Sequence, residues 1–106
     1  MKEIKVIVKN VNCGQETKTI EDALKVLQEI VGGFIEVVTL DNKVLMICNE
    51  EGKCDGLKPN LLFPDDIIVG NVFFVSDGDD GEFASLTDDQ IEFVSELIKD
   101  RQIGSR

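Results

Sequence analysis

The chain has 106 residues, of which 42% are hydrophobic and 30% are charged, a composition typical of one globular domain. Its 21 acidic and 11 basic residues give a net charge of −10, which argues against direct binding to nucleic acid or to an anionic membrane. The absence of histidine excludes Ser-His-Asp, Cys-His and His-ligated metal chemistry. We therefore expect one domain over 1–106 that has no catalytic site, no metal site and no cofactor.

The first half of the chain predicts two strands followed by a helix. Apolar residues alternate with other residues over 4–8, which indicates a strand, and a turn signal at 12–14 precedes a second short strand over 15–19. Helical spacing of apolar residues then predicts a helix with Thr19 as its N-cap and Gly32-Gly33 as its end. The apolar face of this helix comprises Ile20, Ala23, Leu24, Leu27, Ile30 and Val31.

The second half predicts a hairpin, a long loop and one more strand. Strand-like runs at 34–40 and 44–48 are separated by a polar turn, which is typical of a hairpin. The segment 49–64 is rich in glycine, proline, asparagine and charge, and we expect it to form a long loop. A strand is predicted over 67–75, with Gly70-Asn71 marking a bulge or a turn.

The last helix has the clearest local signal. Thr87 and Gln90 have the spacing of a capping box, and apolar residues on either side of the box form a hydrophobic staple. We expect a helix over 88–101 and a frayed tail over 102–106. The predicted fold class is α+β, with a small, mostly antiparallel sheet, two helices packed on one face, and the order β-(β)-α-β-β-β-α.

The loop at 49–60 is the candidate binding segment. Glycines let the backbone approach a ligand closely, asparagines offer donors and acceptors, and lysines supply cations to an otherwise anionic chain. Together they predict a pocket for a small anionic or nucleotide-like ligand. An alternative is that the two asparagines bond their own backbone as Asx-turns. The candidate ligand-binding residues are Asn49, Gly52, Lys53, Gly56, Lys58 and Asn60.

Two acidic segments are further candidates for a site. The run at 77–82 does not fit a calcium-binding EF-hand, because Glu82 occupies the glycine position when Asp77 is placed first. In the last helix, carboxylates recur every four residues and therefore lie about 6 Å apart along one side. This row is either the solvated face of an amphipathic helix or an imitation of nucleic-acid phosphates. Its members are Asp88, Glu92, Glu96 and Asp100.

Several segments between about residues 22 and 98 resemble a known family. The most specific of them is the Gly-Leu-x-Pro-Asn block at 56–60, and the others lie at 30–38, 48–53, 70–74 and 85–91. The chain resembles a small family of unknown function from bacteriophage, plasmid and bacterial genomes, in which a second proline often replaces Lys58. The resemblance implies a phage or mobile-element origin without an activity, and small phage proteins often act against host defences.

The first functional hypothesis is a non-enzymatic protein that sequesters a small nucleotide-like ligand, such as a host immune signal, through the loop. We expect a homo-oligomer, because subunit interfaces create concave pockets that a small domain lacks. The alternative is an acidic protein–protein inhibitor or DNA mimic that acts on a host defence protein. An odd number of cysteines, three, and the lack of a membrane helix or signal peptide predict a soluble protein of the cytoplasm.

Overall fold

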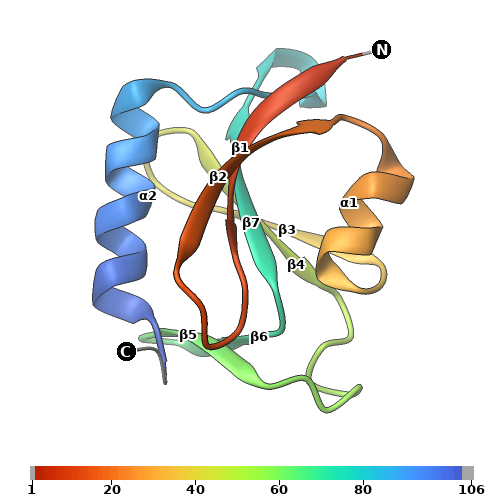
Figure 1. The fold of residues 1–106 in the computed structure, drawn as a ribbon, viewed down its shortest axis with the longest axis vertical. Helices are drawn as coiled ribbons and strands as arrows, with labels where there is room; N and C mark the ends of the chain where they lie inside the picture. Colours follow the sequence, from red (N-terminus) through yellow and green to blue (C-terminus); the bar gives the residue numbers. More distant parts are fainter. Residues whose placement is uncertain (1, 104–106) are drawn as a thin grey trace.

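Two antiparallel sheets and two helices make up the fold (Figure 1). The computed structural model describes residues 2–103, apart from the side chain of Asp80. The elements in chain order are β1 (Glu3–Lys9), β2 (Gln15–Glu21), α1 (Leu24–Val31), β3 (Ile35–Thr39), β4 (Val44–Asn49), β5 (Pro59–Phe63), β6 (Asp66–Val69), β7 (Val72–Asp77), a short 3-10 helix (Asp79–Gly81), β8 (Phe83–Ala84) and α2 (Asp88–Arg101).

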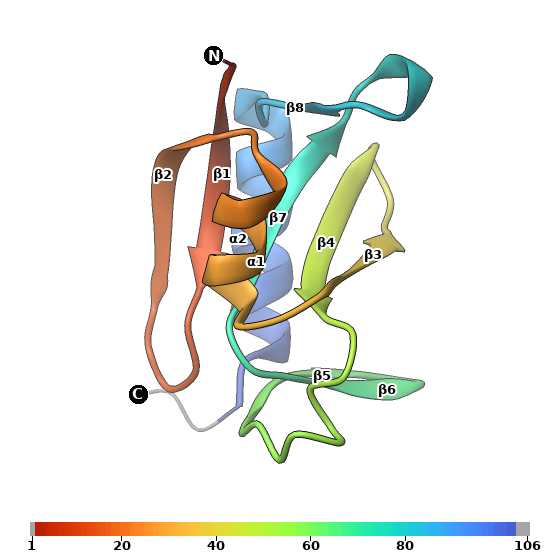
Figure 2. The ribbon, with the colours of Figure 1, turned by 90° about the vertical axis from the view of Figure 1, so that its right-hand side faces the viewer.

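The main sheet has the strand order β2-β1-β7-β4-β3, and β8 pairs with β7. All of its pairings are antiparallel. Strand β7 is central although it comes late in the chain. The sheet is therefore complete only when β7 pairs with β1 and β4, which come much earlier in the sequence. Strands β5 and β6 form a separate hairpin across one end of the main sheet (Figure 2). The predicted α+β class with a mainly antiparallel sheet is confirmed.

The two helices cover opposite faces of the main sheet, which corrects the prediction that both pack on one face. In β4, Val44, Met46 and Cys48 share a core with α2, whereas Leu45 and Ile47 share a core with α1. Figure 2 shows α1 in front of the sheet and α2 behind it. The physical reason is that β4 and β7 are nearly continuous apolar runs, and such strands need cover on both faces.

Helix α1 begins later than its apolar spacing predicts. The predicted N-cap, Thr19, lies in β2, because the pairing of β1 with β2 continues as far as Glu3 opposite Glu21. The observed N-cap is Ala23, which makes no side-chain capping bond. Strand pairing therefore overrides the local helical pattern. The predicted end is confirmed, since Gly32 adopts the left-handed conformation at φ 81°.

Two predictions for the second half need correction. The expected loop at 49–64 contains β5, and the expected strand at 67–75 is two strands that belong to different sheets. The chain turns between them at Gly70, where φ is 79°. A positive φ interrupts a strand and lets the following residues leave the hairpin for the main sheet.

The C-terminal end of the described chain is joined to β5. Gln102 forms an isolated bridge with Leu61, and Ile103 N donates to Asn60 O at 2.9 Å. These two residues were expected to fray, whereas 104–106 lie outside the described residues. Within 2–103, neither helix has the length and apolarity needed to cross a membrane.

Helix α2 has its predicted bounds and its predicted capping box. Thr87 Oγ1 accepts from Gln90 N at 3.2 Å, and Gln90 Oε1 accepts from Thr87 N at 2.9 Å. The same glutamine is buried and donates through Nε2 to Asn42 O at 2.9 Å, Lys43 O at 3.2 Å and Ser76 Oγ at 3.0 Å. Gln90 therefore fixes the start of α2 to the β3–β4 turn and to β7.

We expect Gln90→Ala to destabilise the protein more than Thr87→Ala. Loss of the N-cap at Thr87 costs about 1 kcal/mol. Loss of Gln90 also leaves buried polar groups without a donor, for a total of about 2–3 kcal/mol. The measurement is urea unfolding followed by far-UV circular dichroism, because the chain has no Trp or Tyr. Equal losses would show that the bonds from Gln90 to the turn and to β7 contribute nothing.

Candidate functional site

The loop after β4 borders a cleft whose other walls are β3 and the β5–β6 hairpin. The cleft has a volume of about 130 Å³. Of the six predicted ligand-binding residues, Asn49, Gly52 and Lys53 line it. Lys58 lines a different depression beside α1, and Gly56 and Asn60 line neither one. The structure therefore does not bring the six residues together into one site.

The cleft is negatively charged. Among the residues described, Lys53 is the one base that lines it, and its Nζ forms an ion pair with the carboxylate of Asp66. The hydrogen bond from Lys53, with a second from the backbone N–H of Ile67, holds the pKa of Asp66 below its usual value. Protein pockets that bind drug-sized molecules have volumes of about 300–1,000 Å³. The volume of this cleft is below that range, so it is too small to enclose a nucleotide. The lining carboxylates, which favour a small cation over a phosphate, are Glu36, Glu50, Glu51 and Asp66.

Asn49 bonds the protein's own backbone, as the Asx-turn alternative predicts. Its Oδ1 accepts from Glu51 N at 2.7 Å, and its Nδ2 donates to Val31 O at 3.2 Å. The side chain is buried against Gly33, where an added Cβ would lie 2.8 Å from Asn49 Nδ2. Asn49 therefore connects the end of α1 to the start of the loop, and both of its polar atoms are already used.

Glycine is required at positions 52 and 56 of the loop for two different physical reasons. An added Cβ at Gly52 would lie 2.7 Å from Val69 Cγ2, so glycine allows the loop to pack against β6. Gly56 has a φ of 73°, which favours glycine at this turn. Lys58 is exposed, and its backbone oxygen accepts from Gly70 N at 2.8 Å. These contacts hold the loop to the hairpin.

Asn60 is fully buried and belongs to a polar network inside the protein. Its Oδ1 accepts from Lys9 Nζ at 2.9 Å, and its Nδ2 donates to Lys9 O at 2.9 Å and to Gly70 O at 2.8 Å. Lys9 is also fully buried, and its Nζ donates to Asn10 O at 2.9 Å. Burial lowers the pKa of Lys9. Asn60 therefore stabilises the fold and is not accessible to a ligand.

Lys9 was not among the predicted residues, although the sequence contains a signal for it. Side chains two residues apart on a strand point to the same face, and Ile7 belongs to the core beside α2. The side chain of Lys9 therefore points to the same face of the sheet as the side chain of Ile7. Among the described residues, no carboxylate forms an ion pair with Lys9, so backbone and amide oxygens alone receive its bonds.

The three cysteines differ in accessibility. Cys13 and Cys54 are exposed, whereas Cys48 is buried at the floor of the cleft. Burial, together with the charges of Glu36 and Asp66, raises the pKa of Cys48 to about 11. Its thiol therefore stays protonated and unreactive at neutral pH. Across the described side chains, no group of three His, Cys, Asp or Glu residues is arranged to hold a metal ion.

The carboxylate row of α2 lies on the solvent side of the helix. Its opposite side is buried in the core through Val94 and Ile98. All four members are exposed, and the ion pairs found among residues 2–103 do not include any of them. The members are Asp88, Glu92, Glu96 and Asp100.

Replacement of the buried lysine should change how stability depends on pH. Between the lowered pKa of folded Lys9 and its ordinary value of 10.5, the unfolded chain holds a proton that the folded chain lacks. Raising the pH through this window therefore stabilises the wild type. In Lys9→Met this contribution is absent, so the difference in unfolding free energy between the two proteins should grow in favour of the wild type as the pH rises. Urea unfolding from pH 7 upward measures it, and parallel pH profiles would contradict a lowered pKa.

Residues 4–99 match the model of a family described as a domain of unknown function, DUF3846. No curated protein and no solved structure matches the chain.

Proposed function

Because the chain belongs to the DUF3846 family, whose description names no activity, we propose from its geometry that it is a non-enzymatic protein that binds a basic surface of a partner protein. The carboxylate row of α2 is the binding surface. The observation that carries the proposal is that all four carboxylates are exposed and form no ion pair with another described residue. The net charge of −10 steers such a surface toward cations over a long range.

The spacing of the row carries an energetic cost that a basic partner relieves. Like charges four residues apart on a helix destabilise it by about 0.2–0.5 kcal/mol per pair. The row contains successive pairs of this kind, for example Glu92 with Glu96. Arginine or lysine side chains of a partner would remove this repulsion and form charge-assisted hydrogen bonds. The capping box and the bonds of Gln90 hold the start of the helix, so the backbone that carries the row is formed before binding.

Sequestration of a nucleotide-like ligand stays a prediction, with less support from the geometry. The cleft that Asn49, Gly52 and Lys53 line is acidic and has a volume of about 130 Å³, and Asn60 is buried away from it. A phage or plasmid origin, a cytoplasmic location and a host defence protein as the target also stay predictions, because they rest on the sequence and the family resemblance.

Neutralising the row with isosteric amides should weaken binding strongly. The row variant is Asp88→Asn, Glu92→Gln, Glu96→Gln and Asp100→Asn. A matched control neutralises four exposed carboxylates elsewhere, in Glu3→Gln, Glu16→Gln, Glu29→Gln and Asp55→Asn, so both variants have the same net charge. Immobilised wild type captures basic proteins from a bacterial extract, and calorimetry with each purified candidate measures its affinity.

We expect the wild type and the control to bind one basic protein with an affinity that falls as salt rises. The row variant should bind it at least about tenfold more weakly, since charge-assisted bonds contribute about 1.5–3 kcal/mol each. Equal affinity of the row variant and the control would contradict the proposal, because net charge alone would then explain the binding. Thermal unfolding of both variants shows whether the fold is retained.

A further inference from the structure

Strand β3 leaves one edge of the main sheet uncovered. Among the described strands it pairs with β4 alone. In Figure 2 it lies at the right-hand edge of the main sheet, and no other described strand of that sheet lies beside its outer edge. Unpaired N–H and C=O groups on such an edge form a template for another strand.

The hydrogen bonds at the two ends of β3 determine which backbone groups are free. Glu50 N donates to Phe34 O at 2.8 Å, and Leu40 N donates to Val44 O at 2.8 Å. In an antiparallel pair, residues alternate between those that bond to the neighbouring strand and those whose groups point away from it. The even-numbered residues of β3 therefore bond to β4. The residues with outward N–H and C=O groups are Ile35, Val37 and Thr39.

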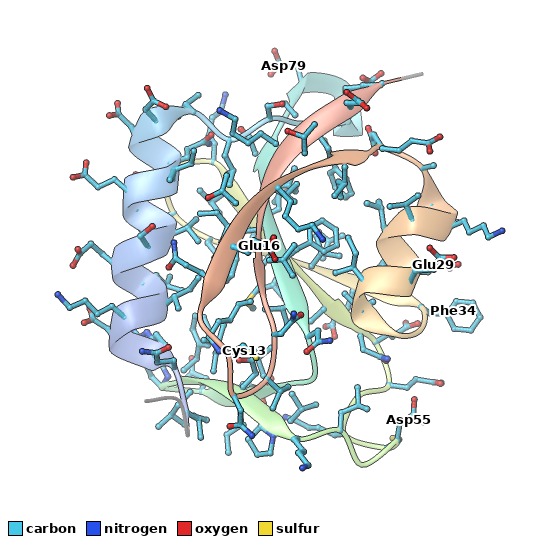
Figure 3. All side chains as sticks on the ribbon, viewed as in Figure 1. Cys13, Glu16, Glu29, Phe34, Asp55 and Asp79 are labelled. Carbon is cyan, nitrogen blue, oxygen red and sulfur yellow. The ribbon has the colours of Figure 1, made fainter. Side chains whose placement is uncertain are left out.

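This edge lacks the usual protection against pairing. The opposite edge, β2, carries three charged side chains, and charges on an edge strand prevent association. Strand β3 carries only Glu36. Val37 is 46% exposed, and Phe34, which precedes the strand, is 65% exposed. Figure 3 shows Phe34 projecting away from the body of the protein. An apolar, uncovered strand beside an exposed phenylalanine favours an interface.

We propose that β3 pairs with β3 of a second copy of this chain, antiparallel, about a two-fold axis at Val37. In this register Val37 faces the partner's Val37, and Ile35 faces the partner's Thr39. Each of these pairs exchanges two hydrogen bonds through the outward groups, so every free group on the strand is satisfied. A two-fold interface requires such self-complementarity.

The neighbouring registers are less favourable. An axis at Glu36 would place two carboxylates directly opposite each other, and like charges in that position are destabilising. An axis at Val38 would leave the outward groups of Ile35 unpaired. With the axis at Val37, Glu36 lies opposite the partner's Val38, and the two carboxylates are separated. The alternation of free groups and the single charge together favour one register for the pairing of two copies.

The dimer is expected to be weak. Its stability should rise with salt, whereas partner binding by the carboxylate row of α2 should weaken with salt. Its core is a five-residue strand with the neighbouring Phe34, which gives a small interface and a dissociation constant of about micromolar order. Each copy carries a net charge of −10, so added salt screens the repulsion and strengthens the dimer. Partner binding by α2 weakens with salt, and therefore failure of one proposal is distinguishable from failure of the other.

Sedimentation equilibrium tests the interface. At tens of micromolar protein and about 0.5 M salt, where the Debye length is only a few ångströms, we expect a mass of twice 11.7 kDa for the wild type. Val37→Lys should raise the dissociation constant at least about tenfold by placing like charges opposite each other. Thr17→Lys adds the same charge to the protected edge β2, opposite the uncharged Ile7, and should leave the dimer intact. A monomeric wild type at every salt concentration, or equal dissociation constants for the two variants, overturns the proposal.

Cysteine cross-linking tests the register without relying on a folded Val37→Lys variant. The background replaces the two exposed thiols, in Cys13→Ser and Cys54→Ser. In it, Val37→Cys should form an inter-chain disulfide with diamide, because directly opposite residues are about 5.5 Å apart between Cα atoms. Thr39→Cys is the matched control, since its two copies would lie about 13 Å apart along the strands. A stronger cross-link for Thr39→Cys than for Val37→Cys overturns the register.

Discussion

The pairing of a buried lysine with a buried asparagine, 51 positions apart in the sequence, connects the main sheet to the separate hairpin. Lys9 ends β1, Asn60 lies in β5, and Gly70 joins the hairpin to β7. The backbone oxygen of Asn60 also receives the N–H of Ile103 after α2. Burial of an amine is costly unless it is hydrogen-bonded, and Asn60 in the hairpin supplies one of the two oxygens that accept from Lys9 Nζ. This contact fixes the hairpin against the end of β1. The cleft and the loop take their positions from the hairpin.

This constraint explains why the distinctive loop is a poor candidate for a ligand site. Its two asparagine side chains are directed inward: Asn49 bonds the end of α1, and Asn60 bonds Lys9. Lys53, the cation nearest the cleft, is neutralised by Asp66. The groups that remain free lie on the surface, as carboxylates along α2 and as backbone groups along β3. One surface is charged and the other is largely apolar, so they suit partners of different chemistry and leave room for both interactions at once.

The elements that the sequence predicted well depend on neighbouring residues. Thr87 and Gln90 set the start of α2, and Gly32 sets the end of α1, because caps act within a few positions. The features that were missed depend on distant residues. No local pattern indicates that Lys9 and Asn60 are partners, since they are 51 positions apart. The placement of the helices on two faces follows from the central position of β7, which local periodicity does not determine. The nearly continuous apolar runs of β4 and β7 are the one local sign that both faces of the sheet are covered.

The unfolding free energy of Asn60→Leu tests most directly whether this loop residue serves the fold. Leucine nearly preserves the volume but leaves Lys9 Nζ with Asn10 O as its one remaining acceptor and removes the amide donor to the backbone oxygens of Lys9 and Gly70. The account predicts a loss of about 2–4 kcal/mol by urea unfolding. Lys58→Ala, at an exposed loop position, should change stability by less than about 0.5 kcal/mol. An Asn60→Leu protein as stable as the wild type would contradict the account and make Asn60 available again as a ligand contact.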